Sequence, residues 1–457
     1  MSCVSQASFL KEGLLASAVG KRLTKAVTWN FIASVSSRSF ALLSSIVIAR
    51  ILGKALFGEL GIIQSTLDTF GAVAGFGMGL TSAKYVAEFR SSDPEKAGRI
   101  IALASGMAWV CGLLTALVLA LCAPWLATHA IAAPTLAPLL KISALSLLLS
   151  AVNGAQMGVL MGFEAFRRIA QVCLVSGFLT MALRIYGTVI LGVQGAVYGM
   201  IIGQVVVCGC TYSVLRRVAA EANIGISYAH CLHELRVLWK FSIPVVLSAL
   251  TDMPAMWVCN AVLVNQPNGY AELGVYIAAN QWYTFLLFIP GILSQTAMPI
   301  MADRISRGEH EESRRIFTTL LKANTLVVVP MIIVGCFSKV IMGCYGREFS
   351  GSWPTMLITV ITAGVVAMQM PAAYMFAAKG KMWIWLLMSI AWGFSFIGLN
   401  FLFVRWGSAG MAMARLIAYS ANCILALAYI FYGFMASREP PVAASIVPLE
   451  ETTGNET

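Results

Sequence analysis

Long apolar stretches, each separated from the next by a short polar segment, set the pattern of the whole chain. Each stretch is about 20 residues or longer, which is the length that an α-helix needs to cross the hydrocarbon core of a bilayer. The stretches are 24–49, 58–83, 99–122, 136–161, 169–191, 194–215, 239–264, 271–301, 316–338, 351–376, 382–404 and 408–435. The pattern predicts an all-α membrane protein with twelve transmembrane helices.

The two halves of the chain resemble each other at a constant offset of 215 residues. The segment LGVQGAVYG aligns with WGSAGMAMA, which matches Gly192 with Gly407, and FGELG (57–61) resembles YAELG (270–274) with a slip of two residues. Each half holds six spans, an even number, so both halves enter the membrane in the same direction. We therefore expect two six-helix halves related by a pseudo-twofold axis along the membrane normal.

The spans and loops predict five parts of the chain. These are a cytoplasmic N-terminal segment (1–23), an N-terminal six-helix bundle (24–219), a cytoplasmic linker (220–238), a C-terminal six-helix bundle (239–436) and a disordered cytoplasmic tail (437–457). The N-terminal segment is charged and has no apolar core of the kind that marks a secretory signal, so the first span is expected to be retained. The tail is polar and contains proline, which is typical of disorder.

Composition and charge agree with a membrane protein. Hydrophobic residues make up 59% of the chain and charged residues 11%, whereas soluble domains average about 25% charged residues. Of the 31 Lys and Arg residues, 22 fall on the side of the N-terminus, five on the opposite side and four within spans. The positive-inside rule therefore places both termini in the cytoplasm. Most of the net charge of +11 is explained by topology, and nothing in it indicates nucleic-acid binding.

Charged residues within the spans are the candidates for function. The cations are Arg38, Lys141, Arg184 and Arg415, and the anions are Asp68 and Asp252. An arginine near the bilayer centre costs about 2.5 to 3.5 kcal/mol on insertion scales, and such residues normally face the interior of a bundle or a wet cavity. Four cations against two anions favour an anionic cargo, and the fork of a guanidinium suits phosphate oxygens.

The depth of these charges leaves two interpretations open. Arg38 lies 14 positions before the turn near Leu52 and Asp68 lies 16 after it, so the two reach nearly the same depth in an antiparallel hairpin. In one interpretation they form a neutral buried bridge; in the other the cations line a cavity that accepts an anionic headgroup. Asp252 lies one position from the repeat counterpart of Arg38, and Lys141 is near enough to the outer end of its span to snorkel.

The glycine motifs are better explained by helix packing than by ligand binding, and patterns typical of metal sites or enzymes are missing. GFGMG (75–79) lacks the Lys-Ser/Thr of a phosphate loop and predicts a kink or a close backbone contact. Two ladders of small residues, Gly154-Gly158-Gly162 and Gly195-Gly199-Gly203, predict close helix packing within the N-terminal bundle. The eleven cysteines and four histidines show no ligand spacing, so we expect no metal site and no disulfide framework. No catalytic pattern indicates an enzyme.

A family resemblance lies in the first hairpin and the loop after it. IVIARILGKALFGELGIIQS (46–65) and GFGMGLTSAKYVAEFRSSDPEKAGRI (75–100) resemble the start of polysaccharide flippases of the O-antigen transporter type. These belong to the multidrug/oligosaccharidyl-lipid/polysaccharide exporter superfamily. The resemblance implies a V-shaped central cavity between the halves. It also implies movement of an undecaprenyl-diphosphate-linked oligosaccharide from the inner to the outer leaflet of the bacterial inner membrane, for surface polysaccharide assembly.

The resemblance further implies roles for the charged residues. The diphosphate would be met by Arg38 first, then by Arg184 and Arg415, with Lys141 as a further cation. A coupling cation, H⁺ or Na⁺, is suspected in this superfamily, and Asp68 or Asp252 would be its site; no other cofactor is implied. The implied partners are the lipid-linked oligosaccharide, membrane lipids, and a polysaccharide polymerase with other assembly proteins.

Two other functions compete with a flippase. A cation-coupled exporter of drugs or other small molecules with the same fold predicts a net acidic cavity, against the charges counted here. A membrane glycosyl polymerase or ligase should carry a long outer loop with essential Arg or His residues. The outer loops of this chain are short.

Overall fold

The structure, a computed structural model, describes residues 18–75, 77–226 and 252–436, and every regular element in these ranges is a helix. Seven helical stretches are long and apolar enough to cross a membrane, and three of them each contain two of the predicted spans. The helix Asp252–Val264 is the described part of the span predicted at 239–264, of which residues 239–251 lie outside the described ranges, and a pair of helices bent by 40° corresponds to the remaining span. The prediction of an all-α membrane protein with twelve spans is confirmed.

The N-terminal half is built from two bent hairpins and the helices between them. Its elements are α2 (Ala18–Ala74), α3 (Met78–Phe89), α4 (Pro94–Trp125), a π-helical turn (Leu126–Ala130), a 3₁₀ turn (Pro134–Leu136), α5 (Ala137–Ser143), α6 (Leu145–Gly162) and α7 (Phe166–Glu221). Two of these helices change direction at a glycine with positive φ, α2 at Gly53 (φ 74°) and α7 at Gly192 (φ 60°, ψ −133°). Glycine takes such a conformation at no steric cost.

The C-terminal half repeats this plan. Its elements are the helix Asp252–Val264, α9 (Gly269–Leu286), α10 (Phe288–Ser306), α11 (His310–Cys336), α12 (Ser338–Tyr345), a 3₁₀ helix (Arg347–Ser352), α13 (Trp353–Ala378), α14 (Met382–Phe403), a 3₁₀ turn (Val404–Trp406) and α15 (Gly407–Ala436). The turn between α14 and α15 is made by Gly407, with φ 61° and ψ −139°. These angles repeat those of Gly192, its partner at the 215-residue offset, so the internal repeat is present in the backbone.

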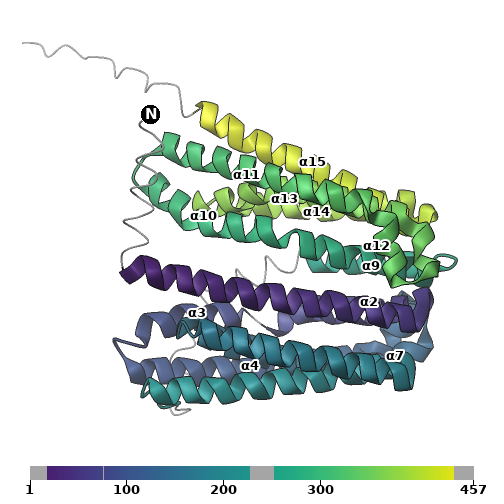
Figure 1. Cartoon of the computed structure of the whole chain (residues 1–457), viewed down its shortest axis with the longest axis horizontal. Coiled ribbons are helices and arrows are strands. Elements are labelled where there is room, and N and C mark those ends of the chain that lie inside the picture. The colour runs from purple at the N-terminus through teal and green to yellow at the C-terminus, as the bar shows by residue number, and fades with distance from the viewer. Residues whose placement is uncertain (1–17, 76, 227–251, 437–457) are drawn as a thin grey trace, which may run out of the picture.

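The two halves form two layers, with α2 and α9 side by side at the boundary between them (Figure 1). Within the layers, α6 packs on α3 and α4, and α13 packs on α11 and α15. The predicted domain boundaries stay a prediction. Residues 1–17, the linker from residue 227 and the tail from residue 437 lie outside the described residues.

Glycines allow the close packing inside the N-terminal half. A Cβ atom on Gly158 would lie 2.0 Å from the carbonyl oxygen of Gly79, and one on Gly199 would lie 2.7 Å from the Cα atom of Arg184. The ladders therefore pack as predicted, within the N-terminal bundle. The kink predicted at GFGMG is also present, because the helix is interrupted between Ala74 and Met78.

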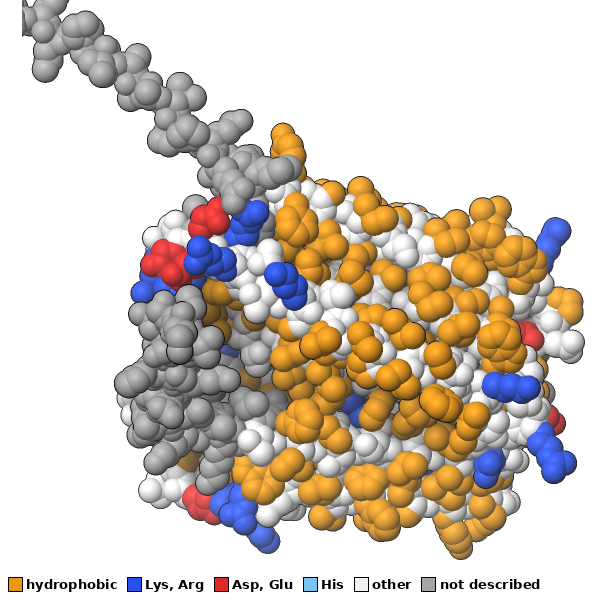
Figure 2. Space-filling model, turned by 45° about the horizontal axis from the view of Figure 1, so that its top comes forward, with side chains coloured by type: hydrophobic (Ala, Val, Ile, Leu, Met, Phe, Trp, Pro, Cys, Tyr) orange, Lys and Arg blue, Asp and Glu red, His pale blue; other side chains and the backbone are white. Residues whose placement is uncertain are grey.

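The surface has an apolar middle and charged ends. Figure 2 shows hydrophobic side chains over the middle of this face and Lys, Arg, Asp and Glu side chains at both ends. Large apolar side chains are exposed in this belt, among them Leu326 (71%) and Ile424 (68%). Ion pairs such as Arg168–Glu221 (2.7 Å) and Arg304–Glu309 (2.6 Å) join residues of the loops predicted to be cytoplasmic. The belt is what a membrane-spanning protein requires, and the sidedness stays a prediction.

Candidate functional site

The two halves come closest at a pair of glycines near one end of the molecule. A Cβ atom on Gly58 of α2 would lie 1.8 Å from the carbonyl oxygen of Tyr270, and one on Gly274 of α9 would lie 2.2 Å from the carbonyl oxygen of Lys54. The contact is reciprocal, since each glycine faces the residue four positions before the other. A twofold relation produces contacts of this kind, so the pseudo-twofold axis between the halves is present in the structure.

Hydrogen bonds between the halves gather at the same end. The Tyr270 hydroxyl donates to the carbonyl oxygen of Ile131 over 2.6 Å, and the Asn265 amide donates to that of Ala130 over 2.7 Å. The Lys54 ammonium donates to the Ser352 hydroxyl over 3.2 Å. This end is the one predicted to face outward. The halves are therefore joined there by both backbone contact and hydrogen bonds.

A second group of polar contacts lies deeper, between α2 and the helix Asp252–Val264. The Asn260 amide donates to the Ser65 hydroxyl over 2.7 Å, and the Trp257 indole N–H donates to the Thr66 hydroxyl over 3.0 Å. Apolar side chains would pack between two helices without such bonds. Polar pairs at this boundary can instead exchange their partners for water or for a polar ligand when the halves separate.

Arg38 bridges the halves at mid-depth. Its guanidinium donates to the backbone carbonyl oxygen of Thr284 over 2.7 Å and lies 5.1 Å from the centre of the Phe288 ring. Arg38 lies 15 residues before Gly53 and Thr284 lies 15 residues after Gly269, so both are about 22 Å from the glycine contact end at 1.5 Å per residue. The half-buried guanidinium uses one of its N–H donors for this bond.

Asp68 does not neutralise Arg38. It lies at the predicted depth, but its carboxylate is exposed and accepts a hydrogen bond from the Gln64 amide over 3.2 Å. Among the described residues no ion pair joins Asp68 to Arg38. The neutral bridge is therefore not the arrangement in this structure. The partner of Arg38 is a backbone carbonyl of the opposite half.

Arg415 lies inside the C-terminal half in a cage of polar and aromatic groups. It is 6% exposed, and it donates to the Tyr276 hydroxyl over 3.1 Å and to the side-chain amide oxygen Oδ1 of Asn280 over 2.7 Å. Its guanidinium carbon lies 3.9 Å from the centre of the Tyr283 ring and 5.6 Å from that of Tyr419. Aromatic faces attract a cation in this geometry. Arg415 is thus held by its own half.

Asp252 also belongs to the C-terminal half. Its carboxylate interacts electrostatically with Arg415 and lines a cavity of about 150 Å³. Gln369, Tyr419 and Asn422 line the same cavity, which has room for a few water molecules. Within the described ranges no three His, Cys, Asp or Glu side chains come together so that they could hold a metal ion.

The four predicted cations are therefore not gathered into one site. Arg38 lies between the halves, Arg415 in the C-terminal half and Arg184 in a cavity of the N-terminal half. Lys141 is exposed on the short helix α5 and has no bonded partner among the described residues. Only Arg38 is at the boundary where a substrate could touch both halves.

Sequence inspection missed the polar face of α9. Tyr276, Asn280, Tyr283 and Thr284 are spaced by four, three and one positions, which places them on one side of a helix. Its side chains supply the hydrogen-bond partners of Arg415, whereas Arg38 binds the backbone carbonyl oxygen of Thr284. The spacing is visible in the sequence and would have marked α9 as a helix that contacts Arg415.

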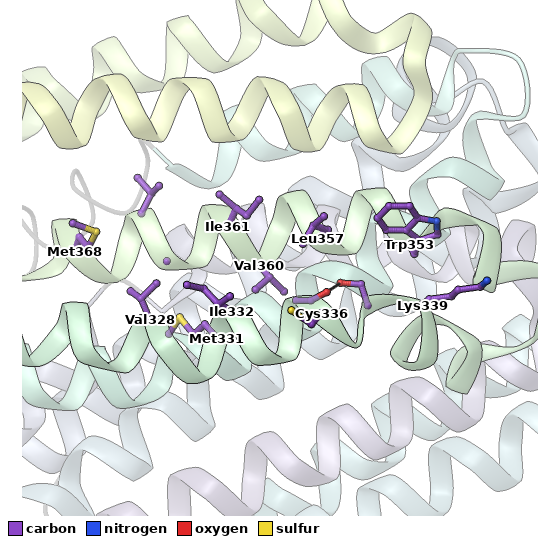
Figure 3. Close-up of a pocket in the computed structure, with 14 residues that line it drawn as sticks. Val328, Met331, Ile332, Cys336, Lys339, Trp353, Leu357, Val360, Ile361 and Met368 are labelled. Carbon is purple, nitrogen blue, oxygen red and sulfur yellow. Dashed lines mark hydrogen bonds between the residues drawn. The ribbon is translucent and has the colours of Figure 1, made fainter.

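An apolar groove lies apart from these residues, on the surface of α11 and α13. It has a volume of about 660 Å³ and is lined by side chains such as Val328, Ile332 and Ile361, with Lys339 and Trp353 at one end (Figure 3). Ile332 is 60% exposed on this side. The groove offers a surface to lipid hydrocarbon and, at its end, one ammonium group.

Comparison with known sequences gives a family. The sequence model of a family described as "Polysaccharide biosynthesis protein" matches residues 47–354. The EPS I polysaccharide export inner membrane protein EpsE of Ralstonia solanacearum is 27% identical over 203 residues, which are 42% of this chain and 44% of that protein. The chain thus matches less than half of the length of this relative.

Comparison with solved structures gives the same fold. A multidrug resistance MATE family transporter of the MOP superfamily, in an inward-facing conformation, superposes with a TM-score of 0.76 at 14% identity, over 89% of this chain and 98% of that one. The lipid II flippase MurJ, in an inward closed conformation, superposes with a TM-score of 0.68 at 14% identity, over 89% of each chain. At these identities the likeness shows a shared two-lobed fold.

Proposed function

We propose that this chain, which belongs to the polysaccharide biosynthesis protein family, is a flippase for a lipid-linked oligosaccharide. It carries an undecaprenyl-diphosphate-linked repeat unit from the inner to the outer leaflet of the bacterial inner membrane by alternating access. Both termini lie in the cytoplasm, as the distribution of Lys and Arg predicts. The family match and the export role in the name of the Ralstonia relative support this proposal.

The observation that carries the proposal is Arg38 at the boundary between the halves. A guanidinium that gives one hydrogen bond to a backbone carbonyl has further N–H donors for phosphate oxygens. The carbonyl of Thr284 is neutral, so a diphosphate is a stronger acceptor for the same group. The substrate headgroup would replace Thr284 as the partner of Arg38.

This replacement would link binding to movement. The bond from Arg38 to Thr284 holds α2 against α9, so a headgroup that takes over Arg38 removes a contact between the halves. A ligand shifts a conformational equilibrium only through a difference in its interactions with the two states. The headgroup supplies this difference, because it competes with the bond from Arg38 to Thr284, which joins the two halves, and not with any contact inside one half.

The energy source would be a coupling cation. Asp252 lies in the small cavity of the C-terminal half near Arg415, and Asp68 lies exposed on α2, and neither carboxylate has an ion-pair partner within the described residues. Uptake or release of H⁺ or Na⁺ at either carboxylate changes the charge balance around the arginines. A polymerase and other assembly proteins would take the translocated unit on the outer side.

Transport of a labelled lipid-linked glycan in proteoliposomes tests the role of Arg38. We expect Arg38→Ala to reduce the rate about ten- to a hundredfold, since a hydrogen bond to a charged group contributes roughly 1.5 to 3 kcal/mol. Arg38→Lys keeps the charge without the planar fork and should lose less. Lys141→Ala is the matched control, because Lys141 is exposed and has no bonded partner among the described residues. Normal transport by Arg38→Ala at an unchanged protein level would refute the headgroup role.

A double substitution separates binding from a structural ion pair. If Arg38 served only to neutralise Asp68 in another state of the cycle, Arg38→Ala combined with Asp68→Ala would restore the transport lost in either single variant. We expect no such recovery, because Arg38 and Asp68 have different partners in this structure.

A further inference from the structure

Arg184 lies in a cavity of its own inside the N-terminal half. The cavity has a volume of about 280 Å³, is lined by side chains of α2, α6 and α7, and is partly open. Its polar lining comes from Ser37, Ser44, Asn153, Ser176 and Thr180 in addition to Arg184. None of the residues that line it is acidic. The cavity therefore carries one positive charge and several hydroxyl groups.

Three buried polar atoms of these lining residues have no hydrogen-bond partner. They are the hydroxyl oxygens of Ser44 and Thr180 and the Nε atom of Arg184. Ser44 is 2% exposed, so bulk solvent does not reach it. Nine in ten or more of the buried polar atoms in folded proteins have a partner. These three atoms do not reach the surface of the cavity, so the donors that face it are the remaining guanidinium nitrogens of Arg184, which have no partner among the described residues.

The charge of Arg184 restricts the kind of ligand that this cavity can bind. The guanidinium of Arg184 makes no hydrogen bond and no ion pair with any described residue, unlike those of Arg415 and Arg38. A guanidinium stays protonated in proteins, so it cannot escape the cost of burial by losing its proton. That cost is several kcal/mol for an ion without a counter-charge. Water can satisfy the hydrogen bonds of a polar cavity, but only an anion compensates the charge.

We propose that this cavity is an anion-binding site in which Arg184 holds a small monovalent anion. One guanidinium without a second cation balances a single negative charge. The cavity is about nine times the volume that one water molecule occupies in the liquid, so the anion fits with part of its hydration shell. The close approach of Gly199 to the Arg184 backbone fixes the position of the part of α7 before Gly192 beside the cavity.

The site is independent of the proposed transport substrate, because it lies within one half and the headgroup path lies between the halves. The helix that carries Arg38 also carries Ser37 and Ser44, on the side that lines the cavity. Anion occupancy would therefore stabilise the packing of α2 on α6 and on the part of α7 before Gly192, which also line the cavity. It would do so whatever substrate the protein carries.

Halide-dependent stability of the purified full-length protein tests the site. The unfolding temperature is measured in detergent as sodium bromide replaces sodium gluconate at constant ionic strength. A ligand that binds only the folded state raises stability in a saturable way. We expect such a rise for the wild type and for the control variants Arg38→Gln and Lys141→Gln, and its loss in Arg184→Gln. Crystals grown in bromide should show an anomalous peak beside Arg184.

Further variants and outcomes keep the test decisive. If Arg184→Gln does not fold, Arg184→Lys, which keeps the charge without the planar fork, should raise the bromide concentration at half-effect several-fold. Identical unfolding temperatures in bromide and gluconate, or an unchanged bromide response in Arg184→Gln, would overturn the proposal. Ordered water alone in the cavity of a bromide crystal would do the same. A stronger response to sulfate than to bromide would contradict the monovalent assignment.

Discussion

Arg184 and Arg415 occupy equivalent depths in the two halves and have opposite surroundings. Arg184 lies eight residues before Gly192 and Arg415 lies eight residues after Gly407, and the two glycines share nearly the same backbone angles. Both arginines are therefore about 12 Å below equivalent turns. Arg415 donates to Tyr276 and contacts two aromatic rings, whereas Arg184 has no bonded partner among the described residues.

The difference shows that the repeat conserves backbone turns but not the chemistry between them. With the offset that aligns Gly58 and Gly274, the α2 positions that correspond to Tyr276, Asn280 and Tyr283 are Leu60, Gln64 and Leu67. The polar and aromatic face that holds Arg415 thus has no counterpart in the N-terminal half. One half binds its arginine through its own polar and aromatic side chains, and the other leaves a charged cavity open to a ligand.

The largest difference in stability between the two halves is expected when each of these arginines is replaced by alanine. Arg415→Ala should destabilise the protein by about 3 to 5 kcal/mol, because it leaves a cavity in a buried cage and removes the donor to Tyr276 and Asn280. Arg184→Ala should leave stability unchanged or raise it in gluconate, because it removes an uncompensated charge. Thermal unfolding of the purified variants in gluconate measures both effects, with Arg415→Lys as the variant that keeps the charge. A loss of similar size in the two alanine variants would mean that Arg184 has a protein partner after all.

The twelve spans, the offset and the glycine ladders could be predicted because they depend on local signals. Runs of apolar residues, small residues at every fourth position and glycines in repeated segments are readable in one sequence. The partners of the charged residues could not be predicted in this way. Thr284 offers a backbone carbonyl 246 positions from Arg38, and no side-chain pattern marks it. The cavity of Arg184 is formed by three separate elements, so spacing along the chain does not reveal it.

Depth alone also gave an incomplete picture of the site. Arg38 and Asp68 reach the same level, as predicted, but they face different neighbours. Depth fixes one coordinate of a side chain in a membrane, and the direction in which it points around the helix is set by packing. For this reason the charges predicted to act together lie in three separate surroundings.

The glycine contact between the halves should respond to substitution more weakly but symmetrically. In Gly58→Ala and in Gly274→Ala the new methyl group meets a backbone carbonyl, at 1.8 Å and 2.2 Å, so the helices must separate. Each should cost about 1 to 3 kcal/mol. Gly61→Ala is the matched control, since its methyl group meets only the Cδ1 end of Ile277, which can rotate away. Denaturant unfolding should give similar losses for the first two variants and a smaller loss for the third. A large difference between Gly58→Ala and Gly274→Ala would argue against the reciprocal contact.

The smallest difference in stability is expected between variants of Glu59 and Glu272, the acidic residues of the repeated segments FGELG and YAELG. The Glu272 carboxylate accepts hydrogen bonds from the backbone N–H and the hydroxyl of Ser408, over 2.7 Å and 2.6 Å, at the first turn of α15. A negative charge at this position satisfies a free N–H group and interacts favourably with the helix dipole. Glu59 has no bonded partner in the described part of the chain, and a Cβ atom on Gly192 would meet nothing within 4 Å.

Glu272→Gln should therefore cost about 1 kcal/mol, because it removes the charge from a helix N-terminus while leaving one acceptor oxygen in place. Glu59→Gln should change stability by less than about 0.5 kcal/mol. Both variants conserve side-chain volume, so unfolding in denaturant compares the two charges directly. The two glutamates then differ as the two arginines do. Glu272 and Arg415 are hydrogen-bonded within the C-terminal half, whereas Glu59 and the guanidinium of Arg184 have no bonded partner among the described residues. Equal losses of stability in Glu272→Gln and Glu59→Gln would contradict this difference between the halves.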